Sequence, residues 1–329
     1  MENDIDVVYT WVDGANPLFK SQLNAWLQQF PSSYASNVSW KRFRDNGEFR
    51  FSLRSVETFA PWFRKIHVIT RGEKPRWLDD SNDRVSIVTH EMIFPDRSSL
   101  PTFNSNAIEL QLHRIPDLSR KFLYFNDDVF LGRATSVNDF ITPKGGQYAY
   151  FHNWRLHSNP NAGFVHDRAY AHTQSVIEKL WGYRRSRLLP AHAPQLYDRE
   201  ILTALEETVP EEFQATASHR FRSSNDLVLR ILYSFCLLEN PDQARRHKLR
   251  ILRSPHAYEF VSLDNDVSRM QRAFLKIRIL RPKFFCINDD IEEVASNHEI
   301  MARLDSFLKS YFQHPSSFER ATKLDVGSR

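Results

Sequence analysis

Two adjacent carboxylates interrupt one of the most apolar stretches of the chain. The run Phe122–Phe125 is followed by Asn126, Asp127 and Asp128, after which Val129–Leu131 continues it. Ionised carboxylates in such surroundings are destabilising unless something neutralises them. A hard divalent cation such as Mg²⁺ or Mn²⁺ would do so, because it prefers carboxylate oxygens and leaves positions open for phosphate. The alternative is a polar turn that ends a buried strand.

The same pattern returns much later in the chain. Lys283 and the apolar run Phe284–Ile287 lead into Asn288, Asp289 and Asp290. Two copies of so unusual a pattern make an accident improbable. No longer internal repeat surrounds them, so the likeness is local.

Basic residues with phosphate-binding chemistry form two further groups. One is the segment Ser218–Ser223, which contains His219, Arg220 and Arg222. The other is Arg50 and Arg54, which lie four apart and would share one face of a helix. Two neighbouring cations repel each other unless an anion bridges them, although two solvated arginines would explain the spacing as well.

Strands and helices that could position these residues alternate along the first half of the chain. Strands are predicted at Ile5–Val12, Lys65–Thr70, Arg84–Thr89 and Phe122–Phe125, and helices at 17–30, Glu48–Phe59 and 102–115. This order predicts a largely parallel sheet flanked by helices. Ligands of such sheets bind beyond the carboxyl ends of the strands. Those ends carry Asp13, Arg71, His90, Asp127 and Asp128.

The second half of the chain is less regular. Segment 134–190 shows weak periodicity and predicts loops and short helices over the site. Helices are expected at Arg199–Glu207, Leu227–Leu238 and Met270–Leu280. We expect one domain, with an α/β half at 1–133, an insertion at 134–190 and a helical half at 191–329.

Composition is that of a globular protein. Hydrophobic residues make up 41% of the 329, which is ample for a core, and Cys236 and Cys286 lie in apolar surroundings that favour buried free thiols. We see no signal peptide and no apolar run approaching the roughly 18 residues of a membrane span. A cytoplasmic, soluble protein is therefore expected.

Positive charge is concentrated in one part of the chain. Although the net charge is only +4, Arg245–Lys283 holds eleven Lys or Arg against three Asp or Glu. An anionic polymer or membrane surface would suit this bias, and so would a simple solvated face. Nucleic acid ranks last, because no nucleic-acid-binding motif is present. The basic helix Met270–Leu280 would either pack its apolar side on the catalytic domain or contact the inner face of the membrane.

Taken together, these motifs resemble the Stealth family, which includes bacterial capsule-polysaccharide phosphotransferases. The resemblance covers nearly the whole chain in the family's order. Its blocks are Ile5–Gly14 (IDVVYTWVDG), Arg42–Ser55 (RFRDNGEFRFSLRS), Pro101–Asn106 (PTFNSN), Phe122–Gly132, His192–Arg222 and Phe284–Ile291 (FFCINDDI).

The resemblance implies transfer of a sugar-1-phosphate from a nucleotide sugar to a glycan hydroxyl, on a Rossmann-like, glycosyltransferase-A-like fold with a divalent metal. It also implies a single catalytic domain, in which 1–133 is the nucleotide-sugar-binding half and 134–190 is a variable insertion. The metal ligands would be Asp127, Asp128, Asn288 and Asp289. The residues expected to bind the nucleotide sugar are Thr10, Trp11, Asp13, Gly14, Arg50, Arg54, Arg71 and Asn104.

The catalytic assignments follow from the same blocks. Arg220 and Arg222 would stabilise charge at the attacked phosphorus. The general base would be His192 or His219, with Asp127 or Asp128 as alternatives. Two rival functions remain open. One is a metal-dependent glycosyltransferase, which would release a nucleoside diphosphate, and the other is a non-catalytic protein that binds an anionic polysaccharide.

Overall fold

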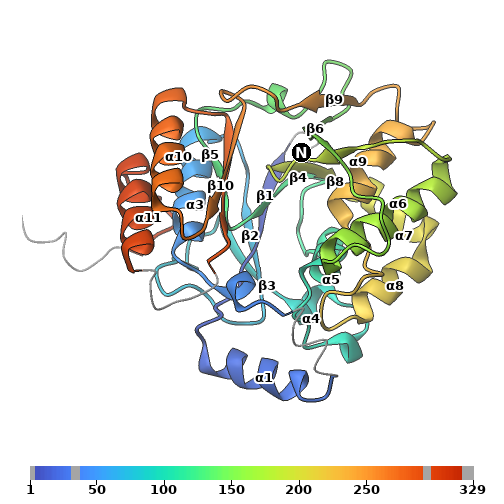
Figure 1. The fold of residues 1–329 in the computed structure, drawn as a ribbon, viewed down its shortest axis with the longest axis horizontal. Coiled ribbons are helices and arrows are strands. Elements are labelled where there is room, and N and C mark those ends of the chain that lie inside the picture. Colours follow the sequence, from blue (N-terminus) through green and yellow to red (C-terminus); the bar gives the residue numbers. More distant parts are fainter. Residues whose placement is uncertain (1–3, 31–37, 292–297, 321–329) are drawn as a thin grey trace, which may run out of the picture.

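A five-stranded sheet forms the centre of the computed structural model, which describes residues 4–30, 38–291 and 298–320 (Figure 1). The strand order is β3-β2-β1-β4-β8. The strands are β1 (Ile5–Thr10), β2 (Ile66–Thr70), β3 (Val85–Thr89), β4 (Lys121–Asn126) and β8 (Gln195–Asp198). The first four are parallel and β8 is antiparallel to β4. The predicted α/β class and the four predicted strands are confirmed.

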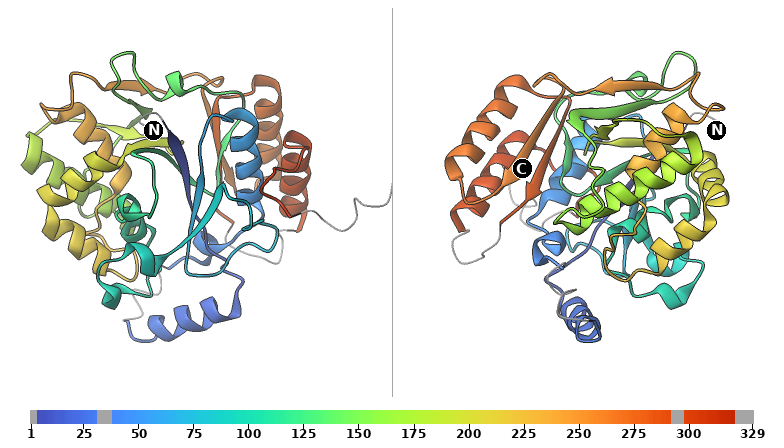
Figure 2. Two further views of the ribbon diagram at one scale, coloured as in Figure 1. Left: turned by 180° about the vertical axis from the view of Figure 1, so that it is seen from behind. Right: turned by 45° about the vertical axis from the view of Figure 1, so that its right-hand side comes forward.

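Alternating side chains of these strands build two cores, one on each face of the sheet. Val8 and Tyr124 point into one core, and Tyr9 and Phe125 point into the other. Figures 1 and 2 show helices on both sides of the sheet. On the first side lie α5 (Ser105–Glu109), α6 (Val165–Trp181), α7 (Arg199–Thr208), α8 (Pro210–Ser218) and α9 (Leu229–Glu239), and on the second lies α3 (Glu48–Phe59).

Two smaller sheets complete the fold. One has the order β10-β11-β5 and the other β7-β6-β9. Their strands are β5 (Val129–Leu131), β6 (Tyr148–Arg155), β7 (Leu188–Pro190), β9 (Lys248–Ile251), β10 (Tyr258–Leu263) and β11 (Phe284–Asp289). Only Asp127 and Asp128 separate β4 from β5, although these strands belong to different sheets. The carboxylate pair therefore lies where two sheets meet.

The remaining helices lie beside the central sheet or over the sheet β10-β11-β5. They are α1 (Pro17–Leu27), α4 (His90–Ile93), α10 (Val267–Leu280) and α11 (His298–Tyr311), with 3-10 turns at Trp40–Phe43, Arg97–Ser99, Leu112–Arg114 and Val137–Asp139. The apolar side of α10 packs on α11, with the rings of Phe274 and Phe307 stacked at 4.1 Å. Of the two alternatives for this helix, the structure shows the packing of its apolar side, through Met270, Phe274 and Ile277. Within the described ranges, no helix is both long and apolar enough to cross a bilayer.

Two expectations about the second half have clear outcomes. Cys236 and Cys286 are buried free thiols, as predicted. The prediction that segment 134–190 holds only loops and short helices is wrong, because it contains the eight-residue strand β6 and the 17-residue helix α6. Pairing with β7 and β9 stabilises β6, and these partners are distant in the sequence.

Candidate active site

The turn between β4 and β5 gathers carboxylates from two parts of the chain. Burial raises the pKa of Asp127 well above its usual value, and the charges of Asp128, Asp45 and Glu48 raise it further. Burial also raises the pKa of Glu48, to about 7. Asp45 is held by Trp11, whose Nε1 donates to Oδ2 at 2.7 Å. Carboxylates that raise one another's pKa in this way fit a divalent cation, which would neutralise them.

His192 lies directly beside this cluster. Its Nε2 is 3.2 Å from Oδ1 of Asp128, and the thiol of Cys286 donates to Oδ2 of the same carboxylate at 3.3 Å. The backbone of His192 is fixed on both sides, since its N–H donates to Nε2 of His152 at 3.3 Å and its carbonyl accepts from Tyr258 at 2.8 Å. The contact with Asp128 places the predicted histidine at the predicted carboxylate.

Cys286 is a member of the site that the sequence did not single out as functional. One ligand atom each from Asp128, His192 and Cys286 lies within 4.8 Å of the others, so this trio could also hold a metal ion. Burial, followed by the charge of Asp128, raises the pKa of the Cys286 thiol well above its usual value. The thiol is therefore a hydrogen-bond donor to Asp128.

The second Asn-Asp-Asp pattern ends β11, next to the first. The two segments are joined by the bond from the Ile287 amide to the Asp128 carbonyl at 2.9 Å. Asp289, predicted as a metal ligand, instead accepts two hydrogen bonds from Arg44, at 2.8 and 2.7 Å, and a third from Asn46 at 3.2 Å. Asn288 shares a strand face with Cys286, and its side chain hydrogen-bonds to Asp290. A metal role for Asn288 stays a prediction.

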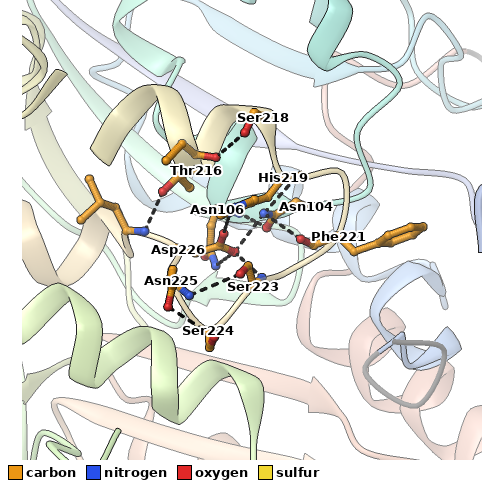
Figure 3. Close-up of polar contacts among 12 residues, drawn as sticks. Asn104, Asn106, Thr216, Ser218, His219, Phe221, Ser223, Ser224, Asn225 and Asp226 are labelled. Atoms are coloured by element: carbon orange, nitrogen blue, oxygen red, sulfur yellow. Dashed lines mark hydrogen bonds and ion pairs between the residues drawn. The ribbon is translucent and has the colours of Figure 1, made fainter. Parts of the chain in front are cut away.

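A buried aspartate organises the loop that contains His219 (Figure 3). Nδ1 of His219 lies 2.8 Å from Oδ1 of Asp226, which is fully buried. The other carboxylate oxygen accepts from Nδ2 of Asn104 at 2.9 Å and of Asn106 at 3.0 Å. Asn104, predicted to bind the nucleotide sugar, is fully buried in this network and holds the loop instead. The sequence offered only one hint of Asp226, its place in Asn225-Asp226 after the basic cluster.

Arg222, in the same loop, affects the pKa of both Arg42 and Glu109. Arg222 donates to Oγ of Ser105 at 2.8 Å. Burial lowers the pKa of Arg42 to about 10, and the charge of Arg222 lowers it further. Burial raises the pKa of Glu109, although the charges of Arg222 and His192 act against this. Glu109 was missed, because one glutamate in the sequence AIELQL looks like an ordinary helix residue.

Arg220 occupies a different position from Arg222. Its guanidinium donates to the carbonyls of Pro101 and Ser98, both at 2.8 Å, and lies 3.8 Å from the ring centre of Trp26. These contacts do not support the prediction that Arg220 binds phosphate. They tie the loop to α1 and to the segment before α5.

We therefore expect the two arginines to respond differently to replacement by lysine. Arg222→Lys should lower turnover by about 10²-fold or more, because lysine keeps the charge but loses the planar fork. Arg220→Lys should chiefly lower the melting temperature, because its carbonyl and ring contacts need the guanidinium plane. Kinetics and thermal melts of both variants check this. Equal turnover in Arg222→Lys and wild type would remove Arg222 from the site.

Arg50 and Arg54 share an anion, as the sequence suggested, but this anion is the side-chain carboxylate of Glu319. Glu319 accepts from both guanidinium groups at 2.5 to 2.8 Å, and its side chain is 2% exposed. The prediction that these arginines bind the nucleotide sugar is not supported. They fix the segment after α11 to α3, where Phe318 also enters the core beside Phe63.

This ion pair makes a prediction about stability. Glu319→Gln should destabilise the fold by about 3 kcal/mol, since it leaves a buried cation without its counter-charge. Burial alone would raise the pKa of Glu319, but hydrogen bonds from Arg54, Ser316 and Arg50 outweigh it and lower the pKa. A lowered folded-state pKa contributes stability above the ordinary value of 4.5, and this is lost as the pH falls through the folded-state value.

Urea denaturation of wild type and Glu319→Gln across pH measures the effect. The difference between them should be largest near neutral pH and shrink below about pH 4.5. Asp305→Asn is the matched control, because Asp305 forms an exposed pair with Lys309 that should contribute less than about 1 kcal/mol. A difference for Glu319→Gln as small as that of the control would contradict the prediction.

The remaining predicted nucleotide-sugar residues lie at the end of β1 and β2. Oγ1 of Thr10 is 3.0 Å from the hydroxyl of Tyr124. Asp13 caps its own turn, and Gly14 allows close approach to the backbone of Phe43, against which a Cβ would clash. Arg71 contacts Gln22 and lies over the rings of Phe19 and Phe103, so it is committed to packing α1.

The fold and the site define an α/β protein with an acidic, histidine-containing centre at the carboxyl edge of its sheet. Four Stealth models match the chain: conserved region 1 at residues 3–30, region 2 at 42–149, region 3 at 191–234 and region 4 at 276–325. The chain belongs to the Stealth protein family, as the sequence motifs predicted.

Similar curated proteins cover nearly all of this chain. It is 34% identical over 319 residues to exopolysaccharide phosphotransferase SCO6023 of Streptomyces coelicolor, covering 96% of this chain and 52% of that protein. It is 33% identical over 331 residues to exopolysaccharide phosphotransferase CpsY of Mycobacterium tuberculosis, covering 99% and 60%. The chain thus spans between about half and three-fifths of the length of these relatives.

Solved structures of galactosyltransferase LgtC show a distant likeness. A complex with donor and acceptor sugar analogues has a TM-score of 0.43 at 11% identity, and an active-site mutant has a TM-score of 0.45 at 12% identity. Each alignment covers 93% of this chain and 96% of the other.

Proposed function

We propose that this chain transfers a sugar-1-phosphate from a nucleotide sugar, expected to be a UDP-sugar, to a hydroxyl of a growing capsular or cell-surface polysaccharide. The products are a phosphodiester and a nucleoside monophosphate. The observation that carries the proposal is the contact of His192 with Asp128 in the carboxylate cluster, together with the effect of both Arg222 and His192 on the pKa of Glu109. Similarity to exopolysaccharide phosphotransferases over 96% of the chain supports the same chemistry.

A divalent cation, Mg²⁺ or Mn²⁺, fits the donor set on this structure's own evidence. Asp127 and Asp128 would hold it, because their carboxylates come from one turn and repel each other in a buried setting. Asp45 and Glu48 lie within electrostatic range of Asp127 and would add to the negative charge. When bound, the cation would neutralise the pyrophosphate of the donor and the leaving phosphate.

His192 is the proposed general base. With Nε2 donating to Asp128, Nδ1 is the nitrogen that can take the proton from the acceptor hydroxyl. The freed oxygen attacks phosphorus, a new P–O bond forms, and the bond to the nucleoside monophosphate breaks. Arg222 is proposed to stabilise the charge that develops on the phosphoryl oxygens. His219, oriented by Asp226, is the second candidate base.

The deciding experiment is a donor screen on the purified chain with Mg²⁺ and a glycan acceptor, read by phosphorus NMR. A phosphodiester product with release of a nucleoside monophosphate supports the proposal. A glycoside with release of a nucleoside diphosphate would instead make the protein a glycosyltransferase. Glycan binding without turnover of any donor would leave a non-catalytic polysaccharide-binding protein.

The cytoplasmic location and the contact with the inner face of the membrane remain predictions. The outer side of α10 exposes Leu275 and Ile279, which are 57% and 68% exposed. Arg272 and Lys276 lie on the same helix, and Lys276 pairs with Glu259. This combination of apolar and basic side chains is compatible with an anionic lipid surface, and no nucleic-acid partner is proposed.

A further inference from the structure

Trp154 is an exposed tryptophan in direct contact with a residue that positions His192. Its side chain is 57% exposed near the end of β6. The alternation of the strand places Trp154 on the same face as His152, and the two rings stack with centroids 4.5 Å apart and planes 19° apart. His152 in turn accepts the backbone N–H of His192 at 3.3 Å.

The support beneath Trp154 is rigid. The ring of His152 also meets Tyr258 edge-on at 5.1 Å, and Tyr258 donates to the His192 carbonyl at 2.8 Å. Burial, followed by the charges of Arg230 and His192, lowers the pKa of His152 to about 4. His152 is therefore neutral near pH 7 and its Nε2 accepts a hydrogen bond. The indole rests on this fixed ring and leaves its other face to solvent.

The contacts of His192 with Asp128 and with His152 bear on which substrate, donor or acceptor, lies next to Trp154. Nε2 of His192 contacts Asp128, the carboxylate expected to lie on the side of the donor phosphates. His152 accepts the backbone N–H of His192, and Trp154 stacks on the ring of His152. If His192 takes the acceptor proton, the acceptor must come from outside the carboxylate cluster. Trp154 reaches His192 through His152 and the backbone, whereas Asp128 contacts the imidazole, and this favours the acceptor as the substrate at Trp154.

A second exposed aromatic follows in the same segment. Phe164, 69% exposed, stacks on His166 at 5.6 Å. Burial lowers the pKa of His166, and so do the charges of Arg222 and Arg42, which places this end of the segment near the cations of the site. Exposed aromatic rings thus stand at both ends of the loop between β6 and α6.

We propose that Trp154 stacks on a sugar ring of the acceptor glycan, next to the sugar whose hydroxyl receives the sugar-1-phosphate. The proposal rests on the proposed function and adds an acceptor subsite to it. The electron-rich face of an indole attracts the C–H bonds on one face of a pyranose. Such stacking needs no charge on the sugar, so it suits a neutral part of a polysaccharide. A nucleobase could stack on the same ring, and the test separates the two.

Saturation-transfer NMR tests binding without requiring turnover. The probes are maltohexaose, chitohexaose and UMP, each with wild type, Trp154→Ala and Trp154→Phe. We expect transfer to at least one hexaose, loss of most of it in Trp154→Ala, and its retention in Trp154→Phe, which keeps an aromatic face. Tyr183→Ala is the matched control, because Tyr183 is 77% exposed and lies beyond the far end of α6.

Kinetics with the acceptor found in the phosphorus NMR screen provide the second readout. Trp154→Ala should raise the acceptor KM about tenfold, the equivalent of one good stacking contact, while kcat and the donor KM stay within about twofold. Thermal melts of the variants confirm that they are folded.

Three results would overturn the acceptor subsite. They are no hexaose binding to wild type, equal hexaose binding in Trp154→Ala, or loss of UMP binding in that variant, which would make Trp154 a nucleobase platform. A failed donor screen would instead reject the proposed function. The hexaose measurement would still show whether Trp154 binds a glycan, because it does not require turnover.

Discussion

Replacing Asp128 by asparagine is expected to lower turnover by about 10³-fold or more, with the fold intact. The carboxylate contacts His192 through Oδ1 and Cys286 through Oδ2. Asparagine keeps the shape but removes the charge that orients the imidazole and stabilises it once protonated. It also presents an NH₂ group where one of these partners needs an acceptor. The loss should therefore appear in kcat rather than in the acceptor KM.

The matched control is Asp242→Asn, an exposed aspartate in the loop after α9. It should leave both turnover and melting temperature unchanged. Circular dichroism and thermal melts establish that Asp128→Asn is folded. Turnover by a folded Asp128→Asn within about tenfold of wild type would exclude Asp128 from the chemistry and would leave His219 with Asp226 as the candidate pair.

Removal of divalent cations is expected to abolish turnover, which Mg²⁺ or Mn²⁺ should restore. The physical reason is the crowding of Asp127, Asp128, Asp45 and Glu48, in which burial and like charges hold the pKa of Asp127 well above its usual value. A cation that relieves this repulsion must also stabilise the folded state. Mg²⁺ should therefore raise the melting temperature of the EDTA-treated protein.

Asp127→Asn should weaken both responses, since it removes one of the two negative charges of the turn. Asp289→Asn makes an informative comparison, because Asp289 is already paired with Arg44 and bonded to Asn46. We expect this variant to lower stability while retaining the thermal response to Mg²⁺. Full activity in EDTA, or a Mg²⁺ response unchanged in Asp127→Asn, would refute the metal site at this turn.

The sequence predicted those parts of the site that depend on a few consecutive residues. A buried strand that stops at two carboxylates is visible within Lys121–Leu131, and the structure places that turn at the sheet edge. Strand alternation and strand order also bring the second Asn-Asp-Asp segment next to the first. The family blocks singled out His192, which the structure places beside Asp128.

The misjudged residues depend on partners that are distant in the sequence. Arg54 and Glu319 are separated by 265 positions, and no spacing rule predicts that this carboxylate reaches α3. Asp289 and Arg44 are 245 positions apart. Both pairs satisfy internally the charges that looked available for a ligand. Glu109 shows the opposite case, because its unremarkable surroundings in the sequence hide a position near Arg222 and His192.

The junction between β4 and β5 makes the position of Asp128 depend on two sheets at once. Two residues join β4 of the central sheet to β5 of the sheet β10-β11-β5, and the bond from the Ile287 amide to the Asp128 carbonyl ties this turn to β11. A slight slip of one sheet past the other would displace Asp128 without disrupting either sheet. Inactivation on heating should therefore precede unfolding, and coincident midpoints for the two would show that the junction is rigid.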